Sequence, residues 1–369
     1  MNPFVYEEFA TGELFCGRNS EIKTMVRYIS DSKNMLLYSK RRFGKSTLIN
    51  ELFEHHLDTS VYVTIYIDLF DMTDPNDFAR LLYKGIADAL PFDYKQKLSE
   101  LKSLFSRVNF SATVKPDGNI SVAPVIAGRL FEELIEDAFT GLLAYLKKQN
   151  KKAVIAFDEF QQIAEIKEKR IDALLRKEIQ KHHNISYIFS GSKKHTLSQL
   201  FSHYSKPLYA MATGIELGGI NEKHFYEYVK IRLNKPISRE VFSYLYKLAQ
   251  SESKLIQHIC YHLYYSDADT VTPLQVDETV SKILKESDGE YRMILDMLPL
   301  SQREALKAVA ATEGIGLLTK ETLQRYNKTK ASMSSALKGL LQKEIIELED
   351  SRYIINGRKF ALWCEQLLQ

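Results

Sequence analysis

The sequence predicts an α/β protein in which a parallel sheet lies between helices, followed by a helical region and a C-terminal region of helices with two short strands. Three observations lead to this fold class. Strand-like and helix-like stretches alternate up to about residue 220, mainly helical periodicity follows from residue 221, and the pattern changes again from residue 289. Strands that alternate with helices are typical of a parallel sheet, because each parallel connection needs a crossover.

The strands of the sheet are expected where short apolar, β-branched or aromatic runs end in turn residues. Helical spacing separates these runs, as in Ile171, Leu174, Leu175 and Ile179. The expected strands are residues 34–39, 61–70, 152–160, 185–192 and 214–220.

Residues 108–126 interrupt the alternation. Two alternating segments flank Pro116-Asp117-Gly118-Asn119, a strong turn sequence. The stretch is either an inserted β-hairpin or a plain loop, and the alternation favours the hairpin.

The C-terminal half divides into two regions. Helices are expected at residues 221–233, 238–250, 253–266 and 275–286. Beyond residue 289, Ser301 and Glu304 have the spacing of a capping box. Further helices at 319–327, around Met333 and Leu337, and at 360–368, with two strands in 344–355, give the order of a winged helix.

These patterns predict three domains. They are a core at 1–220 with the hairpin insertion at about 108–126, a helical domain at 221–288, and a winged helix at 289–369.

The composition is that of a globular protein. The chain has 369 residues, of which 45% are hydrophobic and 26% charged, and its net charge of +3 neither requires nor excludes nucleic acid. We expect no signal peptide or membrane span, and hence a cytoplasmic protein. Three scattered cysteines are expected to be free thiols. The nine histidines show no metal-ligand cluster, and the pairs His55-His56 and His182-His183 are expected at the surface.

One motif carries the phosphate chemistry. Residues 36–52, LLYSKRRFGKSTLINEL, nearly match G-x-x-x-x-G-K-[ST], with Ser39 in place of the first glycine. Gly44 would let the backbone approach phosphates at a helix N-terminus, Lys45 would reach the β- and γ-phosphates, and Ser46 would bind Mg²⁺. A small residue at position 39 could hold the turn at a cost of about 1 kcal/mol. The open alternative is a chance match.

A second motif follows on another strand. AVIAFDEF ends in Asp158 and Glu159, and a carboxylate at the end of a parallel strand faces the same edge as the phosphate loop. Asp158 is expected to hold Mg²⁺ and Glu159 to act as general base. Ser190 or Ser192, at the end of the next strand, would orient the water or the γ-phosphate. The alternative is an acidic turn at a strand end.

Together these segments resemble the archaeal-type ATPases, a branch of the AAA+/STAND group of P-loop NTPases. FCGRNSEI (15–22) is similar to the family's opening near the adenine, and IFSGS matches its strand-end signature. The resemblance implies a P-loop NTPase αβα sandwich, a helical lid and a winged helix, with ATP and Mg²⁺ as cofactors. The implied catalytic residues are Glu159, Lys45 and Ser190, and the implied Mg²⁺ ligands are Ser46 and Asp158. The implied nucleotide-binding residues are Gly17, Arg18, Ser39, Arg41, Arg42, Phe43, Gly44, Lys45, Ser46 and Thr47.

The sequence departs from the family pattern in three places. Met211 stands where the family often has an arginine, which implies slow hydrolysis. In the lid, Ser251 and Ser253 replace a G-x-P turn. The last turn reads N-G-R where D-P is usual.

The leading interpretation is an ATPase that acts as a nucleotide-dependent conformational switch, with the winged helix contacting DNA or a partner protein. Lys330, Ser334 and Lys338 would face outward from its recognition helix, with Arg325 and Lys328 in the turn before it, whereas Glu347, Glu349 and Asp350 would repel a DNA backbone. Two alternatives stay open. One is a DNA- or protein-binding scaffold with a structural, scarcely hydrolysed nucleotide, and the other is a regulatory partner of a nuclease or mobile-element enzyme. The oligomeric state is left open.

Overall fold

The computed structural model describes residues 2–92, 96–114, 120–126, 128, 130–166, 170–192 and 194–367. The chain forms two compact units. The core unit contains Thr11–Lys40 and Lys45–Gly218, and the C-terminal unit contains Met1–Ala10, Arg41–Gly44 and Gly219–Gln369. The tip of the glycine-rich loop is therefore grouped with the C-terminal unit, although its flanks belong to the core.

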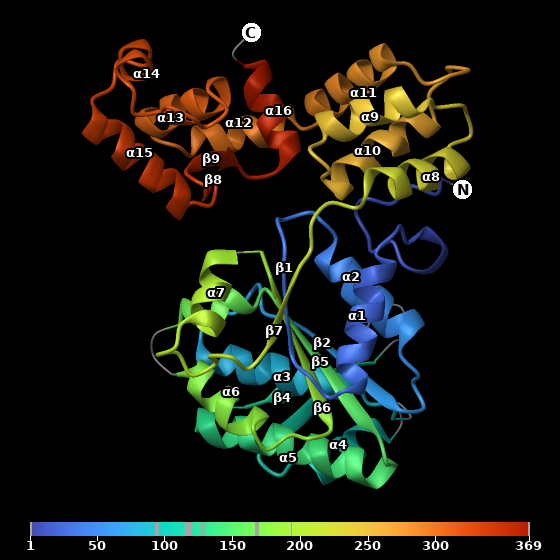
Figure 1. The fold of residues 1–369 in the computed structure, drawn as a ribbon. Coiled ribbons are helices and arrows are strands. Elements are labelled where there is room, and N and C mark those ends of the chain that lie inside the picture. The colour runs from blue at the N-terminus through green and yellow to red at the C-terminus, as the bar shows by residue number, and fades with distance from the viewer. Residues whose placement is uncertain are drawn as a thin grey trace. The chain divides into compact units, whose positions relative to one another are not determined.

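The core unit is built on a parallel sheet, as expected. Its strands lie in the order β2-β5-β6-β1-β7, and every neighbouring pair runs parallel. Strand β6 lies between β1, which precedes the loop, and β5, which ends in the acidic pair (Figure 1). The strands are β1 Met35–Tyr38, β2 Tyr62–Asp68, β5 Lys152–Asp158, β6 Ile185–Gly191 and β7 Thr213–Glu216.

Helices cover both faces of this sheet. Alternate residues of β5 separate into two clusters: Ile155 and Phe157 join the core shared with α3 and α5, whereas Val154 and Ala156 join the one shared with α1 and α2. This two-residue period is what a strand buried on both faces requires. The helices are α1 Asn19–Ser30, α2 Lys45–Glu51, α3 Pro75–Ala89, α4 Lys97–Leu104, α5 Phe131–Gln149, α6 Ile171–Ile179 and α7 Lys194–Ser202.

The inserted hairpin is present. Strands β3 (Asn109–Val114) and β4 (Ile120–Val125) pair antiparallel, which confirms the hairpin over the plain loop. The predicted turn at Pro116-Asp117-Gly118-Asn119 lies outside the described residues.

The C-terminal unit contains the expected lid helices and winged helix. Thr319 and Thr329 cap α14 and α15 through their side chains, and β8 pairs antiparallel with β9. The elements are α8 Glu222–Arg232, α9 Arg239–Leu248, α10 Ser253–Tyr264, α11 Pro273–Glu286, α12 Asp288–Asp296, α13 Leu300–Ala311, α14 Lys320–Arg325, α15 Lys330–Gln342, β8 Ile346–Glu349, β9 Arg352–Ile355 and α16 Arg358–Gln366. The domain boundaries at residues 220 and 288 stay a prediction.

Two local expectations are wrong. The Ser301–Glu304 capping box does not form: α13 begins at Leu300, directly after Pro299, which stands at the N-cap in an extended conformation, so Ser301 already lies inside the helix. His182 is not at the surface. It is 8% exposed and its Nδ1 lies 2.6 Å from the Tyr187 hydroxyl, because the chain turns back between α6 and β6. Burial lowers the pKa of His182 to about 4.

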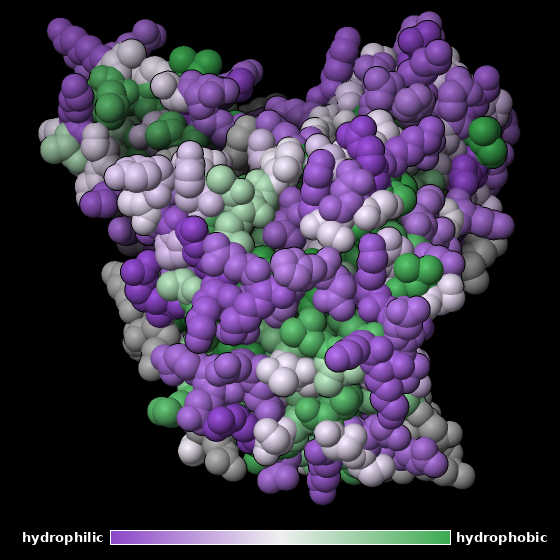
Figure 2. Space-filling model, turned by 60° about the horizontal axis from the view of Figure 1, so that its bottom comes forward, coloured by the Kyte–Doolittle hydropathy of each residue, from purple (hydrophilic) through white to green (hydrophobic). Residues whose placement is uncertain are grey.

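The surface fits the composition. On the face drawn in Figure 2, hydrophilic side chains predominate and hydrophobic ones form smaller groups between them. Among the described residues, every helix is too short or too polar to cross a lipid bilayer. Cys16, Cys260 and Cys364 are buried and form no disulfide, as expected.

Candidate functional site

The glycine-rich loop connects β1 to α2, and its backbone explains why Ser39 is tolerated. The residues with positive φ in the loop are Arg42 (67°) and Gly44 (84°), and Ser39 is not among them. Ser39 is buried, and its hydroxyl donates to the Lys40 carbonyl at 2.9 Å. Glycine's conformational freedom is therefore needed at position 44 and not at position 39.

The space at Gly44 suits an incoming anion. A Cβ placed on Gly44 would meet nothing within 4 Å, so the backbone there is open to approach. Helix α2 starts at the next residue and continues as a π-helical turn through Leu52–His56. First-turn N–H groups of a helix lack intrahelical acceptors and carry partial positive charge. The local backbone thus fits a phosphate group, with the partly buried Ser46 and Thr47 and the buried Lys45 immediately after it.

Asp158 is a buried carboxylate held by three hydrogen-bond donors. It is 2% exposed at the end of β5, where its Oδ2 accepts from the Ser46 hydroxyl at 2.6 Å and from the Tyr66 hydroxyl at 2.5 Å. The backbone N–H of Glu159 donates to Oδ1 at 3.0 Å. These three donors fix the orientation of the carboxylate. Ser46 and Asp158 therefore come together, and a hydroxyl beside a carboxylate is an oxygen donor set that Mg²⁺ accepts.

Glu159 is held in an unusual conformation beside this group. Its backbone is left-handed, with φ 50°, and its Oε2 accepts from the Ser192 hydroxyl at 3.2 Å and from the Gln161 side-chain amide. Gly191 leaves room for Gln161, since a Cβ there would lie 2.0 Å from the Gln161 Oε1. The structure thus brings Ser192 to the carboxylate of Glu159.

Ser190 is placed differently. It is fully buried in β6, and its Oγ has no hydrogen-bond partner among the described residues. Its neighbour in the sheet is Leu37 of β1, two residues before Ser39.

Negative charge accumulates at this edge of the sheet. Asp68 is paired in register with Asp158 at the ends of β2 and β5. Burial raises the pKa of Asp68, and the charges of Asp158 and Glu159 add to the shift. The pKa of Tyr66 is raised by burial and by the adjacent Asp158, so the phenol stays a donor. A bound cation would relieve this repulsion.

The tip of the loop makes a separate set of contacts, all within the C-terminal unit. Arg41 pairs with Glu344, which lies directly before the winged-helix hairpin. The Arg42 Nη1 lies 3.8 Å from Glu252, and the Arg42 carbonyl accepts from the Lys254 N–H at 3.3 Å. A Cβ on Gly357 would lie 2.4 Å from Arg42, and Gly357 has φ 85°. The N-G-R turn is thus a place where the glycine lets an arginine approach.

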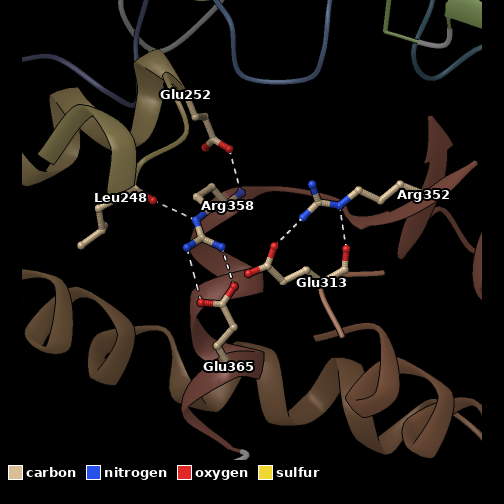
Figure 3. A network of polar contacts seen from close by, with 6 residues as sticks. All are labelled: Leu248, Glu252, Glu313, Arg352, Arg358 and Glu365. Atoms are coloured by element: carbon tan, nitrogen blue, oxygen red, sulfur yellow. Dashed lines mark hydrogen bonds and ion pairs between the residues drawn. The ribbon is translucent and has the colours of Figure 1, made fainter. Parts of the chain in front are cut away.

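Glu252 also contacts Arg358 of the winged helix, which in turn contacts Leu248 of the lid. We call these contacts the lid–winged helix staple. The Glu252 Oε2 accepts from the Arg358 N–H at 2.8 Å, and the Arg358 Nε donates to the Leu248 carbonyl at 2.8 Å (Figure 3). Arg358 also forms a two-point pair with Glu365 of α16. A second pair in Figure 3, Arg352 with Glu313, lies within the winged helix.

Gly17 and Arg18 lie at the start of α1. Both have positive φ, and the Arg18 guanidinium donates to the Gly218 carbonyl at 2.7 Å and to Glu21 at 3.1 Å. Arg18 therefore ties α1 to the segment after β7. Phe43, partly buried, completes the loop tip.

Sequence reasoning missed Tyr66, Gln161, Glu252 and Glu344. Tyr66 carried a weak signal, because it lies two residues before Asp68 and so shares one face of the strand expected at residues 61–70. The two glutamates carried none, since they lie far from the loop in the sequence.

The recognition helix has the expected faces. Met333, Leu337 and Leu340 of α15 are buried, whereas Lys330, Ser334 and Lys338 are exposed. Leu341 is only partly buried. On the hairpin, Asp350 is exposed and Glu347 and Glu349 are partly exposed.

Comparison with known proteins places this architecture. The model of the ATPase domain predominantly from Archaea matches residues 15–259, and that of a probable winged helix domain matches residues 289–366. A Methanocaldococcus jannaschii relative, named an uncharacterised ATP-binding protein, is 26% identical over 42% of this chain and 44% of its own length, so the match spans less than half of that relative. Another from the same organism is 20% identical over 95% of this chain and 98% of its own.

Solved structures share the fold. The Walker-type ATPase of Pyrococcus abyssi superposes with a TM-score of 0.66 at 16% identity, covering 98% of this chain and 99% of its own. The ORC2 protein of Aeropyrum pernix, solved as ADPNP-ADP complexes, has a TM-score of 0.57 at 12% identity, covering 98% and 97%. The ORC1 protein of the same organism, solved in complex with DNA, has a TM-score of 0.54 at 12% identity, covering 98% and 94%.

Proposed function

Because the chain belongs to the family of ATPase domains found predominantly in Archaea, we propose that it binds ATP with Mg²⁺, hydrolyses it slowly, and uses the nucleotide state to reposition its loop tip. One observation carries the proposal. The Ser46 hydroxyl bonds to the buried Asp158 at 2.6 Å, two residues after a left-handed Gly44 with open space above it. A hydroxyl, a strand-end carboxylate and an open helix N-terminus are the parts that bind a metal-complexed triphosphate.

Each residue has a role that follows from its position. The N–H groups around Gly44 and the ammonium of Lys45 bind the phosphates, and Ser46 with Asp158 holds the metal. Mg²⁺, when bound, neutralises phosphate charge. Glu159 accepts the proton of the attacking water, and Ser192 orients the Glu159 carboxylate through their hydrogen bond. Ser190, buried against β1, acts by packing beneath the loop.

Slow hydrolysis follows from two features. Met211 packs on the hydrophobic core where the family often has an arginine, so it supplies no positive charge to a transition state. Glu159 already accepts hydrogen bonds from Ser192 and Gln161, so its carboxylate must share or release these donors to accept a proton from water.

The coupling to the downstream domains works by competition. Arg41 pairs with Glu344, and Arg42 lies beside Glu252. Arginine has the donor geometry to bind phosphate oxygens in place of a carboxylate. Binding of a triphosphate would draw these arginines away, and Glu252 would then hold only the Arg358 N–H of the lid–winged helix staple.

Nucleotide titration tests the site. We expect Lys45→Ala to weaken ATP binding about 100-fold, because a charged hydrogen bond to phosphate is lost at about 3 kcal/mol. Lys40→Ala, five residues earlier on the exposed loop, is the matched control and should change the affinity little. Equal ATP affinity in wild type and Lys45→Ala would refute the proposed site.

The winged helix is proposed as the output surface, with DNA as the first candidate ligand. The exposed Lys330 and Lys338 of α15, with Arg325 before it, favour a phosphate backbone. Duplex binding that weakens as salt rises, and that falls in Lys330→Ala plus Lys338→Ala, would support DNA. Absence of salt-dependent binding would assign the face to a partner protein.

The second candidate function is a scaffold with a structural nucleotide, which the two slow-hydrolysis features favour. Phosphate release with a Glu159→Gln control separates it from a slow ATPase, since a scaffold shows no Glu159-dependent turnover. A regulatory partner of a nuclease or mobile-element enzyme would be found by co-purification of such an enzyme with the full chain.

A further inference from the structure

Two histidines of the lid lie on one face of α10. His258 and His262 are separated by four residues, which places them one helical turn apart, and their ring centroids are 5.1 Å apart. The last residue of α11, Glu286, reaches the same place: its Oε2 lies 3.7 Å from the His262 Nε2. One ligand atom from each of the three side chains lies within 4.8 Å of the others.

We propose that His258, His262 and Glu286 form a binding site for a Zn²⁺-class cation, outside the nucleotide loop. Zinc is commonly bound by two imidazoles and one carboxylate at about 2.0–2.2 Å, with a fourth position left open. Ligand atoms around such an ion lie about 3.3 Å apart. The Glu286 side chain is 49% exposed, so it has the freedom to close the remaining distance.

One of the proposed ligands, His258, is held in place by an aromatic neighbour. The Tyr6 ring stacks on the His258 ring at 3.9 Å with an interplanar angle of 13°, which fixes the plane of that imidazole. Oriented imidazoles bind metals more tightly than mobile ones. His258 and Glu286 also line a cavity of about 360 Å³, which gives room for water or another ligand at the open position.

The charges of this cavity define the kind of ion. Glu7, Glu252, Glu286 and Glu290 share its lining with Arg42, Lys254 and Lys359. With both signs present, bulk acidity cannot hold a cation, and affinity must come from direct bonds to the ligand atoms. Mg²⁺ and Ca²⁺ prefer sets of oxygen ligands, whereas Zn²⁺ and Co²⁺ accept imidazole.

The proposal departs from the expectation that the histidines form no metal-ligand cluster. The third ligand comes from another helix, 24 residues further along the chain, and the α10–α11 packing that brings it near has no local sequence signal. A bound ion would join α10 to the end of α11, directly before Ser287, whose hydroxyl accepts from the Lys359 ammonium of α16 at 2.9 Å. It would thus stiffen the lid where the winged helix begins.

Cobalt absorption tests the site on the nucleotide-free full chain. We expect one Co²⁺ per chain with visible d–d bands, displaced by Zn²⁺ and not by excess Mg²⁺. His262→Ala and Glu286→Gln should each weaken Co²⁺ binding at least tenfold, while His224→Ala, on the exposed face of α8, should leave it unchanged.

Thermal unfolding with and without Zn²⁺ distinguishes loss of metal binding from misfolding of a variant. Zn²⁺ should raise the unfolding midpoint of the wild type and not that of His262→Ala, provided that the circular dichroism spectra of the metal-free proteins agree. No Co²⁺ bands in the wild type would overturn the proposal. So would bands that survive in His258→Ala plus His262→Ala, or that vanish in a His55→Ala variant of the His55-His56 pair instead.

Discussion

The residues after the phosphate loop and the residues at its tip differ in the partners that their side chains bind. After the loop, Ser46 is already bonded to Asp158, and Asp158 accepts from two more donors, so the proposed metal-binding group is assembled within the core unit. At the tip, Arg41 and Arg42 pair with Glu344 and Glu252 of the C-terminal unit. Under the proposed function, the contrast separates the residues proposed to perform the chemistry from the residues whose partners would change when phosphate binds.

The difference teaches where regulation can act. A preassembled carboxylate–hydroxyl group needs no rearrangement to receive a metal, so its contribution is fixed by the fold of the core. An arginine that has to leave one anion for another makes nucleotide affinity depend on the anion it leaves. Mutations in the lid and winged helix should therefore alter ATP affinity without touching the site.

The largest expected effect is on the rate of hydrolysis and concerns the proposed general base. Glu159→Gln should lower the rate of phosphate release by about 10²–10⁴-fold, because general base catalysis contributes that much. ATP affinity should stay within about twofold, since the amide keeps the shape of the side chain. Single-turnover phosphate release measures the rate, with the exposed Glu165→Gln as a matched control. Unchanged turnover in Glu159→Gln would show that Glu159 is not the general base.

The next effect sharpens the regulatory side. Glu252→Gln should raise ATP affinity about fivefold, because Arg42 no longer has to leave a carboxylate worth about 1 kcal/mol. The glutamine oxygen can still accept from the Arg358 N–H, so the staple to the winged helix persists. Glu290→Gln, another carboxylate of the same cavity, is the control. Equal or weaker ATP binding by Glu252→Gln would refute the claim that Arg42 has to leave Glu252 when ATP binds.

A smaller effect concerns pH. Burial raises the pKa of Glu252, and the Arg358 N–H and the charges of Arg42 and Lys254 only partly oppose it. The folded protein therefore binds a proton here more tightly than the unfolded chain does. The free energy of unfolding should fall as pH rises from the unfolded pKa of about 4.3 to the raised folded value, and the loss should persist above it.

Denaturant titrations of wild type and Glu252→Gln check this sign. The variant, which cannot ionise here, should gain stability relative to wild type as pH rises through that window. A difference between the two proteins that is independent of pH would mean that Glu252 has an ordinary pKa and is not held by burial.

The smallest effect concerns the departure from the loop motif. Ser39→Gly should change ATP affinity by less than about twofold, because Ser39 does not occupy the left-handed region that favours glycine. Gly44→Ala is the contrasting variant and should weaken binding strongly, since φ 84° strains a side chain there. Fluorescent-nucleotide titration of both variants compares them, and a larger loss in Ser39→Gly would contradict the account.

Sequence reasoning reached the parts of the molecule that local patterns specify. The apolar run before Asp158 predicts a buried parallel strand, and the ends of parallel strands meet at one edge, so Ser46 and Asp158 could be brought together in advance. Ser190 was named as the catalytic serine, but the sequence could not show which of Ser190 and Ser192 contacts Glu159, because that depends on which way each residue points at the end of β6.

Contacts between distant segments were beyond reach for a different reason. Glu344 and Arg41 are 303 residues apart, and an acidic residue before a hairpin has no local mark of its partner. The burial of His182 and the approach of Glu286 to His262 likewise depend on helix packing, which a polar sequence pattern does not reveal. Such residues carry the proposed regulation and the proposed metal site.

Hydrogen exchange at the Lys254 amide tests the coupling most directly. That N–H lies in the first turn of α10, where it has no intrahelical acceptor, and its partner is the Arg42 carbonyl at 3.3 Å. If phosphate draws the loop tip away, saturating Mg·ATP should speed exchange at Lys254 in the wild type and leave it unchanged in Lys45→Ala. Exchange at Lys254 that stays the same, or slows, when ATP is bound would contradict the account.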